Sequence, residues 1–284
     1  MTQIHPTALV DREAQLGTQV SVGPFCIVEA GAEIGDRCQL MPHAIVKSGT
    51  SIGEDCRIHE FAVVGGRPQH LRAGEQLGRV EMGRNNVIHE HVTIHRAAHE
   101  GHVTRLGDNN MLMVNVHVAH DCTLGSHVII TNNTLLGGHV EIQDRAFVSG
   151  DVAVHQFCRI GKFAMVGGKA AVKKDVPPFI LLDGVANGVV GLNLVGLRRN
   201  GFSQEEIRQL KEAYWLMYRS GLRWEEVLVE LEAKFTTGPA AELFPFLSSG
   251  KRGFMPERRV PVGATVPLHE DSASPPELTL RRVG

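Results

Sequence analysis

The residues of this chain best suited to chemistry lie close together between Asn115 and Cys122. Two histidines, His117 and His120, and the carboxylate of Asp121 fall within five residues. An imidazole beside an acid suggests a general base held in one orientation, because the carboxylate decides which ring nitrogen carries the proton. We therefore begin with His120 as a candidate base and Asp121 as its orienting partner.

Two more histidines follow at similar spacings. His120, His139 and His155 lie 19 and 16 residues apart. If the chain winds in coils of about 18 residues, as the repeat described next indicates, these three side chains stack on one side of the molecule. None occupies a core position of that repeat. We expect all three to project outwards, where a ligand or another subunit can meet them.

A six-residue repeat must position these side chains. An aliphatic residue recurs at every sixth position from Ile4 onwards, with few exceptions up to Val172, and the residue four positions later is small or β-branched, as at Val116. Glycine often follows the aliphatic residue, as at Gly17, and it would supply the backbone angles of a tight corner. Two inward positions and one corner per hexad describe a prism of short parallel strands. We predict an all-β solenoid, a parallel β-helix of hexapeptide repeats.

Two interruptions break the repeat, at residues 65–78 and 97–104. The first contains Gln69, His70 and Arg72. Departures from a rigid solenoid are either tolerated insertions or binding loops, and the polar side chains favour binding for the first one.

The five cysteines share the small inward position of the repeat. A reactive thiol or a metal site is possible there, but a small buried hydrophobic residue is the simpler interpretation. Their odd number and the lack of a Cys-x-x-Cys motif argue against a disulfide framework. The cysteines are Cys26, Cys38, Cys56, Cys122 and Cys158.

The repeat stops near two prolines, Pro177 and Pro178, which interrupt strand pairing. The run 203–206 then has the pattern of a capping box and predicts a helix to about Ser220. A second helix should carry Trp224 to Phe235, and a short third one residues 243–247. We predict a β-helix over residues 1–190, a small C-terminal helical domain over 191–250, and a flexible tail over 251–284.

Composition excludes several classes of protein. The 284 residues carry a formal net charge of −2, so no overall basic field points to nucleic acid. No apolar run is long enough for a membrane span, and the first residues do not resemble a signal peptide. These features predict a cytoplasmic protein.

Several runs together resemble the UDP-N-acetylglucosamine O-acyltransferase family of hexapeptide-repeat enzymes. They are residues 94–96 (IHR), 117–122 (HVAHDC), 137–139 (GGH), 155–157 (HQF), 175–178 (DVPP) and 196–199 (GLRR). The resemblance covers about residues 1–250. It implies a left-handed β-helix and a homotrimer with active sites between subunits. It also implies transfer of an acyl or 3-hydroxyacyl group from acyl carrier protein to the 3-hydroxyl of UDP-N-acetylglucosamine, the first step of lipid A biosynthesis, without a metal or other cofactor.

The resemblance also implies roles for individual residues. His120 would be the general base, Asp121 its partner, and the backbone N–H of Gly138 the donor to the oxyanion. Gly168 would end the acyl groove and set the chain length, and with a glycine there a long chain near fourteen carbons is expected. The remaining substrate contacts would be Gln69, His70, Arg72, His117, His139, His155, Gln156, Asn193 and Arg199.

General chemistry agrees with this assignment. A sugar hydroxyl is a weak nucleophile, and a neutral imidazole that takes its proton contributes about 10²–10⁴-fold. The acid-free segment 159–174 holds five basic residues that could receive an acidic carrier protein, or could simply be solvated. They are Arg159, Lys162, Lys169, Lys173 and Lys174.

The chain departs from the family pattern at several positions. His70 stands where the family usually has aspartate, and Arg72 where it has lysine. Asn200 replaces an arginine and Ala186 a histidine. The aspartate is associated with the acyl 3-hydroxyl, so the choice between plain and 3-hydroxyacyl groups stays open.

Two other classes of protein remain open. One is a zinc protein like γ-class carbonic anhydrase, although Cys122 stands where the second histidine of a pair with His117 would be expected. The other is a hexapeptide acyltransferase with different sugar-nucleotide or acyl specificity, or a scaffold without activity.

Overall fold

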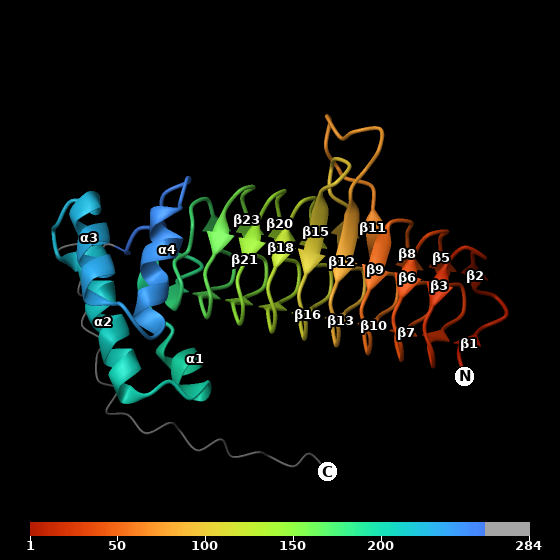
Figure 1. Cartoon of the computed structure of the whole chain (residues 1–284), viewed down its shortest axis with the longest axis horizontal. Helices are drawn as coiled ribbons and strands as arrows, with labels where there is room; N and C mark the ends of the chain where they lie inside the picture. Colours follow the sequence, from red (N-terminus) through yellow and green to blue (C-terminus); the bar gives the residue numbers. More distant parts are fainter. Residues whose placement is uncertain (259–284) are drawn as a thin grey trace, which may run out of the picture.

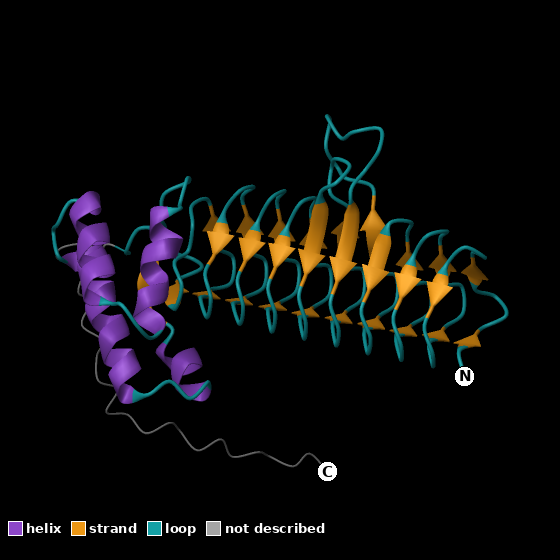
Figure 2. Ribbon diagram, in the orientation of Figure 1, coloured by secondary structure: helices purple, strands orange, loops and turns teal. Residues whose placement is uncertain are grey.

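The computed structural model describes residues 1–258, and the chain up to Leu182 winds into a triangular prism (Figure 1). Each coil adds one short strand to each of three parallel sheets, which form the faces of the prism (Figure 2). We call the faces A, B and C in the order in which the chain enters them, and the edges between them the A–B, B–C and C–A corners. The structure is the predicted left-handed parallel β-helix.

The strands are short, and strands of successive coils pair in register. Face A contains β1 (Gln3–Ile4), β4 (Ser21–Val22), β7 (Gln39–Leu40), β10 (Arg57–Ile58), β13 (Val87–Ile88), β16 (Met111–Leu112), β19 (Ile129–Ile130), β22 (Phe147–Val148), β25 (Met165–Val166), β27 (Ile180–Leu182) and the antiparallel β28 (Val189–Leu192). Face B contains β2 (Leu9–Val10), β5 (Ile27–Val28), β8 (Ile45–Val46), β11 (Val63–Gly66), β14 (Thr93–His95), β17 (His117–Val118), β20 (Leu135–Leu136), β23 (Ala153–Val154) and β26 (Ala171–Val172). Face C contains β3 (Gln15–Leu16), β6 (Glu33–Ile34), β9 (Thr50–Ile52), β12 (Arg79–Met82), β15 (Val103–Leu106), β18 (Thr123–Leu124), β21 (Glu141–Ile142) and β24 (Arg159–Ile160).

The six-residue aliphatic positions fill the interior of the prism. Ile58 pairs with Leu40 and Ile88 on the neighbouring coils, so these side chains form continuous apolar stacks. All five cysteines are free and fully buried in the same core, which confirms their interpretation as small core residues. Burial raises the pKa of the Cys122 thiol to about 12 and keeps it protonated.

The corner glycines serve a different purpose from the predicted one. Most of them, including Gly17 and Gly137, have ordinary φ angles, whereas the left-handed conformation falls two residues later, at Gln19 and His139. A Cβ on Gly137 would lie 2.8 Å from the backbone nitrogen of Gln156 on the next coil. Glycine is needed at these positions because successive coils approach closely, and not because the backbone turns there.

Both interruptions of the repeat leave the prism at the same corner. The first joins β11 to β12, and the second joins β14 to β15, so both project from the B–C corner as the loops at the top of Figure 1. The two loops contact each other, since the backbone N–H of Gly74 donates to the carbonyl of Ala98 at 2.9 Å. We call them the first loop (67–78) and the second loop (96–102).

Helices close one end of the prism (Figure 2). The three predicted helices are present as α2 (Gln204–Arg219), α3 (Trp224–Lys234) and α4 (Leu243–Ser248), and the predicted capping box at Ser203 is formed with Glu206. The sequence did not indicate two shorter elements, α1 (Leu194–Arg199) and the 3₁₀ turn η1 (Pro239–Glu242). The helices pack around their own apolar cluster, which includes Phe179 and Leu210.

The segment after α4 differs from the predicted tail in its first residues. Phe254 forms a bridge with Asp175, Glu257 forms one with Val189, and Met255 is buried. Residues 251–258 therefore return to the end of the prism, and the rest of the predicted tail, 259–284, lies outside the described residues. Within residues 1–258, no helix has both the length and the apolar character needed to cross a bilayer.

Candidate active site

The predicted stack of histidines is formed along the B–C corner. Strand β17 leads into His120 at this corner, and on the next two coils β20 leads into His139 and β23 into His155. The strands keep the coils in register, because His117 pairs with Leu135. Gln156 lies exposed next to His155 at the same corner. The spacing of these residues along the sequence thus predicted their common position correctly.

His120 and Asp121 form the pair that a general base requires. The Nδ1 atom of His120 lies 2.7 Å from Oδ2 of Asp121, and both side chains are almost completely buried. Since a carboxylate can only accept, Nδ1 carries the proton and Nε2 is left with its lone pair. The ring can therefore accept a proton at Nε2, and Asp121 can stabilise the imidazolium that results.

Gly138 lies directly against the reactive edge of His120. A Cβ built on Gly138 would lie 2.6 Å from Cε1 and 2.7 Å from Nε2 of that ring. Among the described residues, no acceptor is found for the backbone N–H of Gly138, whereas His139 N–H donates to the carbonyl of His120. An available N–H beside a proton acceptor is the arrangement that stabilises an oxyanion formed next to the base.

The second loop holds Asp121 in place. Its Oδ2 accepts a 3.0 Å hydrogen bond from the backbone N–H of Ala98, and its Oδ1 lies 3.1 Å from Nδ1 of His102. Thr104, in β15 just after this loop, accepts a hydrogen bond from the backbone N–H of Asp121 at 2.8 Å. Burial raises the pKa of the Asp121 carboxyl, but the hydrogen bonds from Ala98, His120 and His102 outweigh it and hold the pKa below its usual value. The carboxylate therefore stays ionised.

Sequence reasoning missed His102 and did not assign the second loop a role. The sequence does contain a signal for His102, because a histidine inside an interruption of the repeat, one coil before His120, is a candidate partner of the base. The strand pairs on either side of the loop place the two histidines together, since β15 pairs with β18.

His120 differs from its prediction in one respect. It leaves the prism surface as expected, but only 7% of it is exposed, because neighbouring side chains cover it. His70 of the first loop lies edge-on against it, with ring centroids 4.9 Å apart, and His139 does the same from the next coil at 5.3 Å. His139 and His155 are exposed as predicted. Gln69 and Arg72 are exposed residues of the first loop.

His117 lies beside this cluster and is kept neutral. Its Nδ1 is 2.8 Å from the Thr93 hydroxyl, and its ring packs edge-on against His95, which in turn contacts the carbonyl of Arg67 at 2.6 Å. Burial and, secondarily, the neighbouring His95 lower the pKa of His117 to about 4. A neutral ring at this place can hydrogen-bond a sugar without adding charge.

We expect His117 to make the fold less stable in mild acid. The unfolded chain binds a proton at this ring near pH 6.5, whereas the folded protein binds it only near pH 4, so stability falls as the pH drops through this window. In His117→Gln, the loss of stability between pH 7 and pH 5 should be smaller than in the wild type, as measured by urea unfolding at one protein concentration. Exposed His127→Gln serves as the control, and an equal loss in wild type and His117→Gln would contradict the assignment.

The remaining predicted site residues do not lie at the B–C corner of the same chain. Gly168 follows β25 and lies exposed at the A–B corner. Asn193 is buried as the N-cap of α1, where its side chain accepts from Gly196 N–H and donates to the carbonyl of Phe163. Arg199 is exposed at the end of α1. The start of α1 is held at the C–A corner, because its capping residue Asn193 donates to Phe163, which lies between β24 and β25.

The predicted basic face is smaller than its sequence suggests. Arg159 is mostly buried, pairs with Asp175 at 2.7 Å and packs on the Phe246 ring, and Lys162 pairs with Glu242 at 3.0 Å. These two cations attach the helices to the prism and are not available to a partner. The exposed cations are Lys169 at the A–B corner, and Lys173 and Lys174, which follow β26 at the B–C corner beyond His155.

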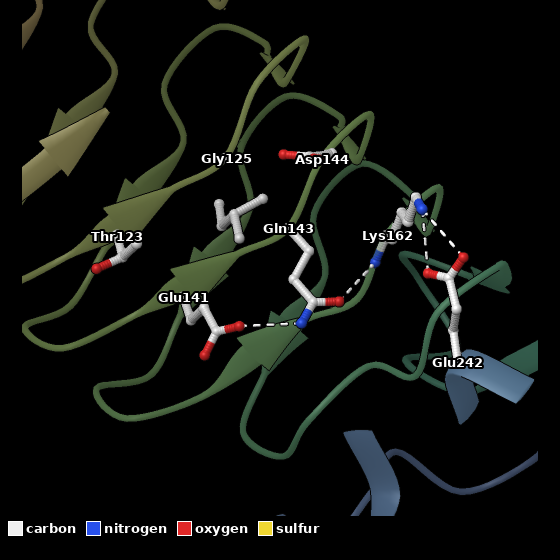
Figure 3. Close-up of a pocket in the computed structure, with 8 residues that line it drawn as sticks. Thr123, Gly125, Glu141, Gln143, Asp144, Lys162 and Glu242 are labelled. Carbon is white, nitrogen blue, oxygen red and sulfur yellow. Dashed lines mark hydrogen bonds and ion pairs between the residues drawn. The ribbon is translucent and has the colours of Figure 1, made fainter. Parts of the chain in front are cut away.

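A pocket on face C lies apart from the histidines (Figure 3). It is lined mainly by polar residues of β18, β21 and the turn that follows, and the ion pair between Lys162 and Glu242 closes one side. Gln143 bridges the pocket by donating to Glu141 at 3.0 Å and accepting from the backbone N–H of Lys162 at 3.1 Å. None of the predicted site residues lines it.

The possibility of a metal at the B–C corner can be assessed from the ligand atoms. His120, Asp121 and His139 offer one ligand atom each, all within 4.8 Å of one another. The pair expected for a carbonic anhydrase-like site is not formed, because Cys122 points into the core and donates to the carbonyl of Gly137, whereas His117 lies on the outside. A zinc site built on these two residues is thereby excluded by geometry.

Comparisons with known proteins agree on one family. Residues 175–255 match the family described as UDP-N-acetylglucosamine O-acyltransferase, domain 2, and residues 31–66 and 104–138 match the bacterial transferase hexapeptide family. The chain is 48% identical over 257 residues to the acyl-[acyl-carrier-protein]–UDP-N-acetylglucosamine O-acyltransferase of Alkalilimnicola ehrlichii, covering 90% of this chain and 100% of that protein. It is 46% identical, with the same coverage, to the protein of that name from Halorhodospira halophila.

Solved structures give the same result. The UDP-N-acetylglucosamine O-acyltransferase of Moraxella catarrhalis superposes with a TM-score of 0.85 at 40% identity, covering 89% of this chain and 99% of that one. The enzyme of Bacteroides fragilis gives 0.86 at 37% identity, with 89% and 100% covered. The similarity therefore extends over the prism and the helical end together.

Proposed function

The chain belongs to the UDP-N-acetylglucosamine O-acyltransferase family, and on this premise we propose that it transfers an acyl group from acyl carrier protein to the 3-hydroxyl of UDP-N-acetylglucosamine. This reaction is the first step of lipid A biosynthesis. The observation that supports it best is the His120–Asp121 pair, whose free Nε2 lies against the backbone of Gly138. We place the reaction in the cytoplasm.

The residues of the B–C corner can perform this transfer directly. Nε2 of His120 takes the proton of the sugar 3-hydroxyl while the oxygen attacks the thioester carbonyl carbon. The carbonyl oxygen becomes an oxyanion that the N–H of Gly138 stabilises. The intermediate then breaks its C–S bond, and the thiolate of the carrier protein recovers the proton from the His120 imidazolium. The products are the O-acylated UDP-sugar and the free thiol.

We propose a homotrimer with active sites between subunits, and the positions of the other residues support it. Gly168 and Arg199 occupy different corners from His120, so on one chain they lie away from a substrate bound at the B–C corner. A neighbouring prism can present its own A–B or C–A side to the B–C corner. We propose that the acyl chain and the nucleotide each extend across such an interface, and light scattering that gave a monomer would contradict this.

The proposed reaction is tested by mass spectrometry of the product. Purified protein is incubated with UDP-N-acetylglucosamine and an equal mixture of acyl and 3-hydroxyacyl carrier proteins. We expect a product with the mass of one added acyl group, which mild alkali removes as an ester. An alkali-stable amide, product only from another UDP-sugar, or no product would reject the assignment. The ratio of the two acyl products answers the question that His70 leaves open.

Arg199 and the exposed lysines are expected to act on different substrates. A guanidinium suits phosphate oxygens, so Arg199→Ala should raise KM for the UDP-sugar. The triple change of Lys169, Lys173 and Lys174 to alanine should instead raise KM for acyl carrier protein, because the lysines attract its acidic surface. Steady-state kinetics with each substrate varied in turn measures both. The same KM changing in both variants would contradict this division.

Gly168 is expected to set the acyl chain length. A Cβ there would meet only the carbonyl of Gly150, at 3.3 Å, and the Cβ of Ser149, at 3.9 Å, so a larger side chain can enter without disturbing the core. Each buried CH₂ contributes about 0.8 kcal/mol, so blocking four carbons corresponds to about 3 kcal/mol, or on the order of a hundredfold in selectivity.

The measurement compares wild type and Gly168→Met on carrier proteins that carry chains of ten to sixteen carbons. The wild type should prefer a chain near fourteen carbons, and the variant should prefer a shorter one. An unchanged profile would mean that Gly168 only relaxes a corner of the prism.

A further inference from the structure

A second cluster of histidines and carboxylates lies at the A–B corner, on a different edge of the prism from His120. His59 follows β10 and His89 follows β13, and these strands are paired with Ile58 opposite Ile88. The two rings therefore stack on successive coils, with centroids 4.8 Å apart and planes 15° from parallel. One ligand atom from each of His59, His89 and Glu90 lies within 4.8 Å of the other two.

The charges of this cluster are not balanced by the protein. Glu60 and Glu90 occupy the same position on the two coils, and their carboxylates lie 3.6 Å and 3.5 Å from Nδ1 of His59 and His89. Among residues 1–258, neither carboxylate forms an ion pair with a lysine or an arginine. With neutral imidazoles, the four side chains carry two negative charges, which is the charge that one divalent cation neutralises.

The backbone that carries these ligands is held rigidly. Phe61, directly after Glu60, stacks on His43 of the preceding coil at 4.7 Å and on His91 of the next coil at 5.2 Å, with both pairs 6° from parallel. Strand pairing fixes the same coils on the other side of the ligands. A site whose ligands sit on rigid elements needs little rearrangement to bind its ion, which favours binding.

The ligand types indicate which cation fits. Zn²⁺ and similar transition metals take imidazole nitrogen together with carboxylate oxygen, usually with four ligands, whereas Mg²⁺ and Ca²⁺ prefer six or more oxygen atoms. We propose that His59, His89 and Glu90 bind one divalent cation of the zinc type in each chain, with the Glu60 carboxylate beside His59 adding a second negative charge. The ion would connect two successive coils and stabilise the prism.

The experiment measures Zn²⁺ binding to the metal-free full-length protein by isothermal titration calorimetry, with Mg²⁺ as a second titrant. Because His120, Asp121 and His139 could also take an ion, all variants are made in a His139→Ala background. In that background we expect one Zn²⁺ per chain and no comparable binding of Mg²⁺. His59→Gln and His89→Gln should each weaken Zn²⁺ binding by at least about 10–100-fold. Metal affinity already falls by this factor when a group that only hydrogen-bonds to a metal ligand is replaced.

A matched control and a second readout keep the result unambiguous. His127→Gln changes an exposed histidine at another corner and should leave binding unaltered. Saturating Zn²⁺ should raise the melting temperature of the background protein and of the control, but not of the two ligand variants, because an ion that binds only the folded state stabilises it. Metal-free melting temperatures equal to that of the background protein show that the variants are folded. The proposal is overturned if the background protein does not bind Zn²⁺, if His59→Gln and His89→Gln bind as the control does, or if one ion binds per three chains.

Discussion

Replacing the base is expected to have the largest effect on activity: His120→Ala should lower kcat by at least about 10²-fold and up to about 10⁴-fold. Its Nε2 is the proton acceptor next to Gly138, and none of the surrounding histidines can replace it in this position. His70 and His139 only pack edge-on against its ring, and Asp121 holds the Nδ1 side. Single-turnover measurements at saturating substrate would report the chemical step itself.

The partner of the base provides a graded comparison. Asp121→Asn keeps the size of the side chain but removes the charge that stabilises the imidazolium, so kcat should fall less than in His120→Ala. His155→Ala, at the same corner, removes an expected substrate contact and should act mainly on KM. Near-wild-type activity of a folded, correctly assembled His120→Ala protein would exclude His120 as the base.

The second large effect is expected from adding one methyl group. In Gly138→Ala the new Cβ would lie 2.6 Å from Cε1 of His120, a distance at which one of the two groups must move. His120 cannot move without losing its 2.7 Å hydrogen bond to Asp121 or displacing His70 and His139. Because a misplacement of about 1 Å can reduce a rate about 10²-fold, we expect kcat to fall by a factor of that order or more.

A double variant distinguishes this steric conflict from general damage to the fold. Once His120 is alanine, no ring is present for the new methyl group to meet, so His120→Ala/Gly138→Ala should be no less active than His120→Ala alone. Gly150→Ala, also at a corner of the prism, is the control, because its Cβ would come no closer than 3.2 Å to a neighbouring atom. Full activity in Gly138→Ala would show that the base does not use this geometry.

Much of the fold could be predicted because it depends on a local pattern that repeats. The aliphatic residue at every sixth position decides which side chains enter the core, so the coils, the buried cysteines and pairs one coil apart, such as Leu112 with Ile130, follow from the sequence. The capping box at Ser203 is equally local, and α2 begins where it predicts. The common position of His120 and His139 needed only the length of one coil.

The parts that could not be predicted depend on contacts between distant residues. His102 and Ala98 hold the carboxylate of Asp121 because the second loop folds back towards it. No periodic pattern in the sequence governs how such a loop folds. The burial of His120 has the same origin, since it is covered by His70 of the first loop, which lies 50 residues earlier in the chain. A repeat specifies which face a residue occupies, but not which loop will cover it.

The sequence by itself determined the prism, its core and the corner at which the candidate base lies, because hydrophobic burial at a fixed period decides which residues of each coil face inwards. The left-handed winding was expected only from the family resemblance. The tertiary structure decided what surrounds that base. It showed that glycines at the corners allow coils to approach, as Gly138 allows His120, and that Arg159 and Lys162 attach the helices to the prism. It also separated Gly168 and Arg199 from His120 onto different corners, because a residue's corner depends on its place within the coil and not on the function it serves.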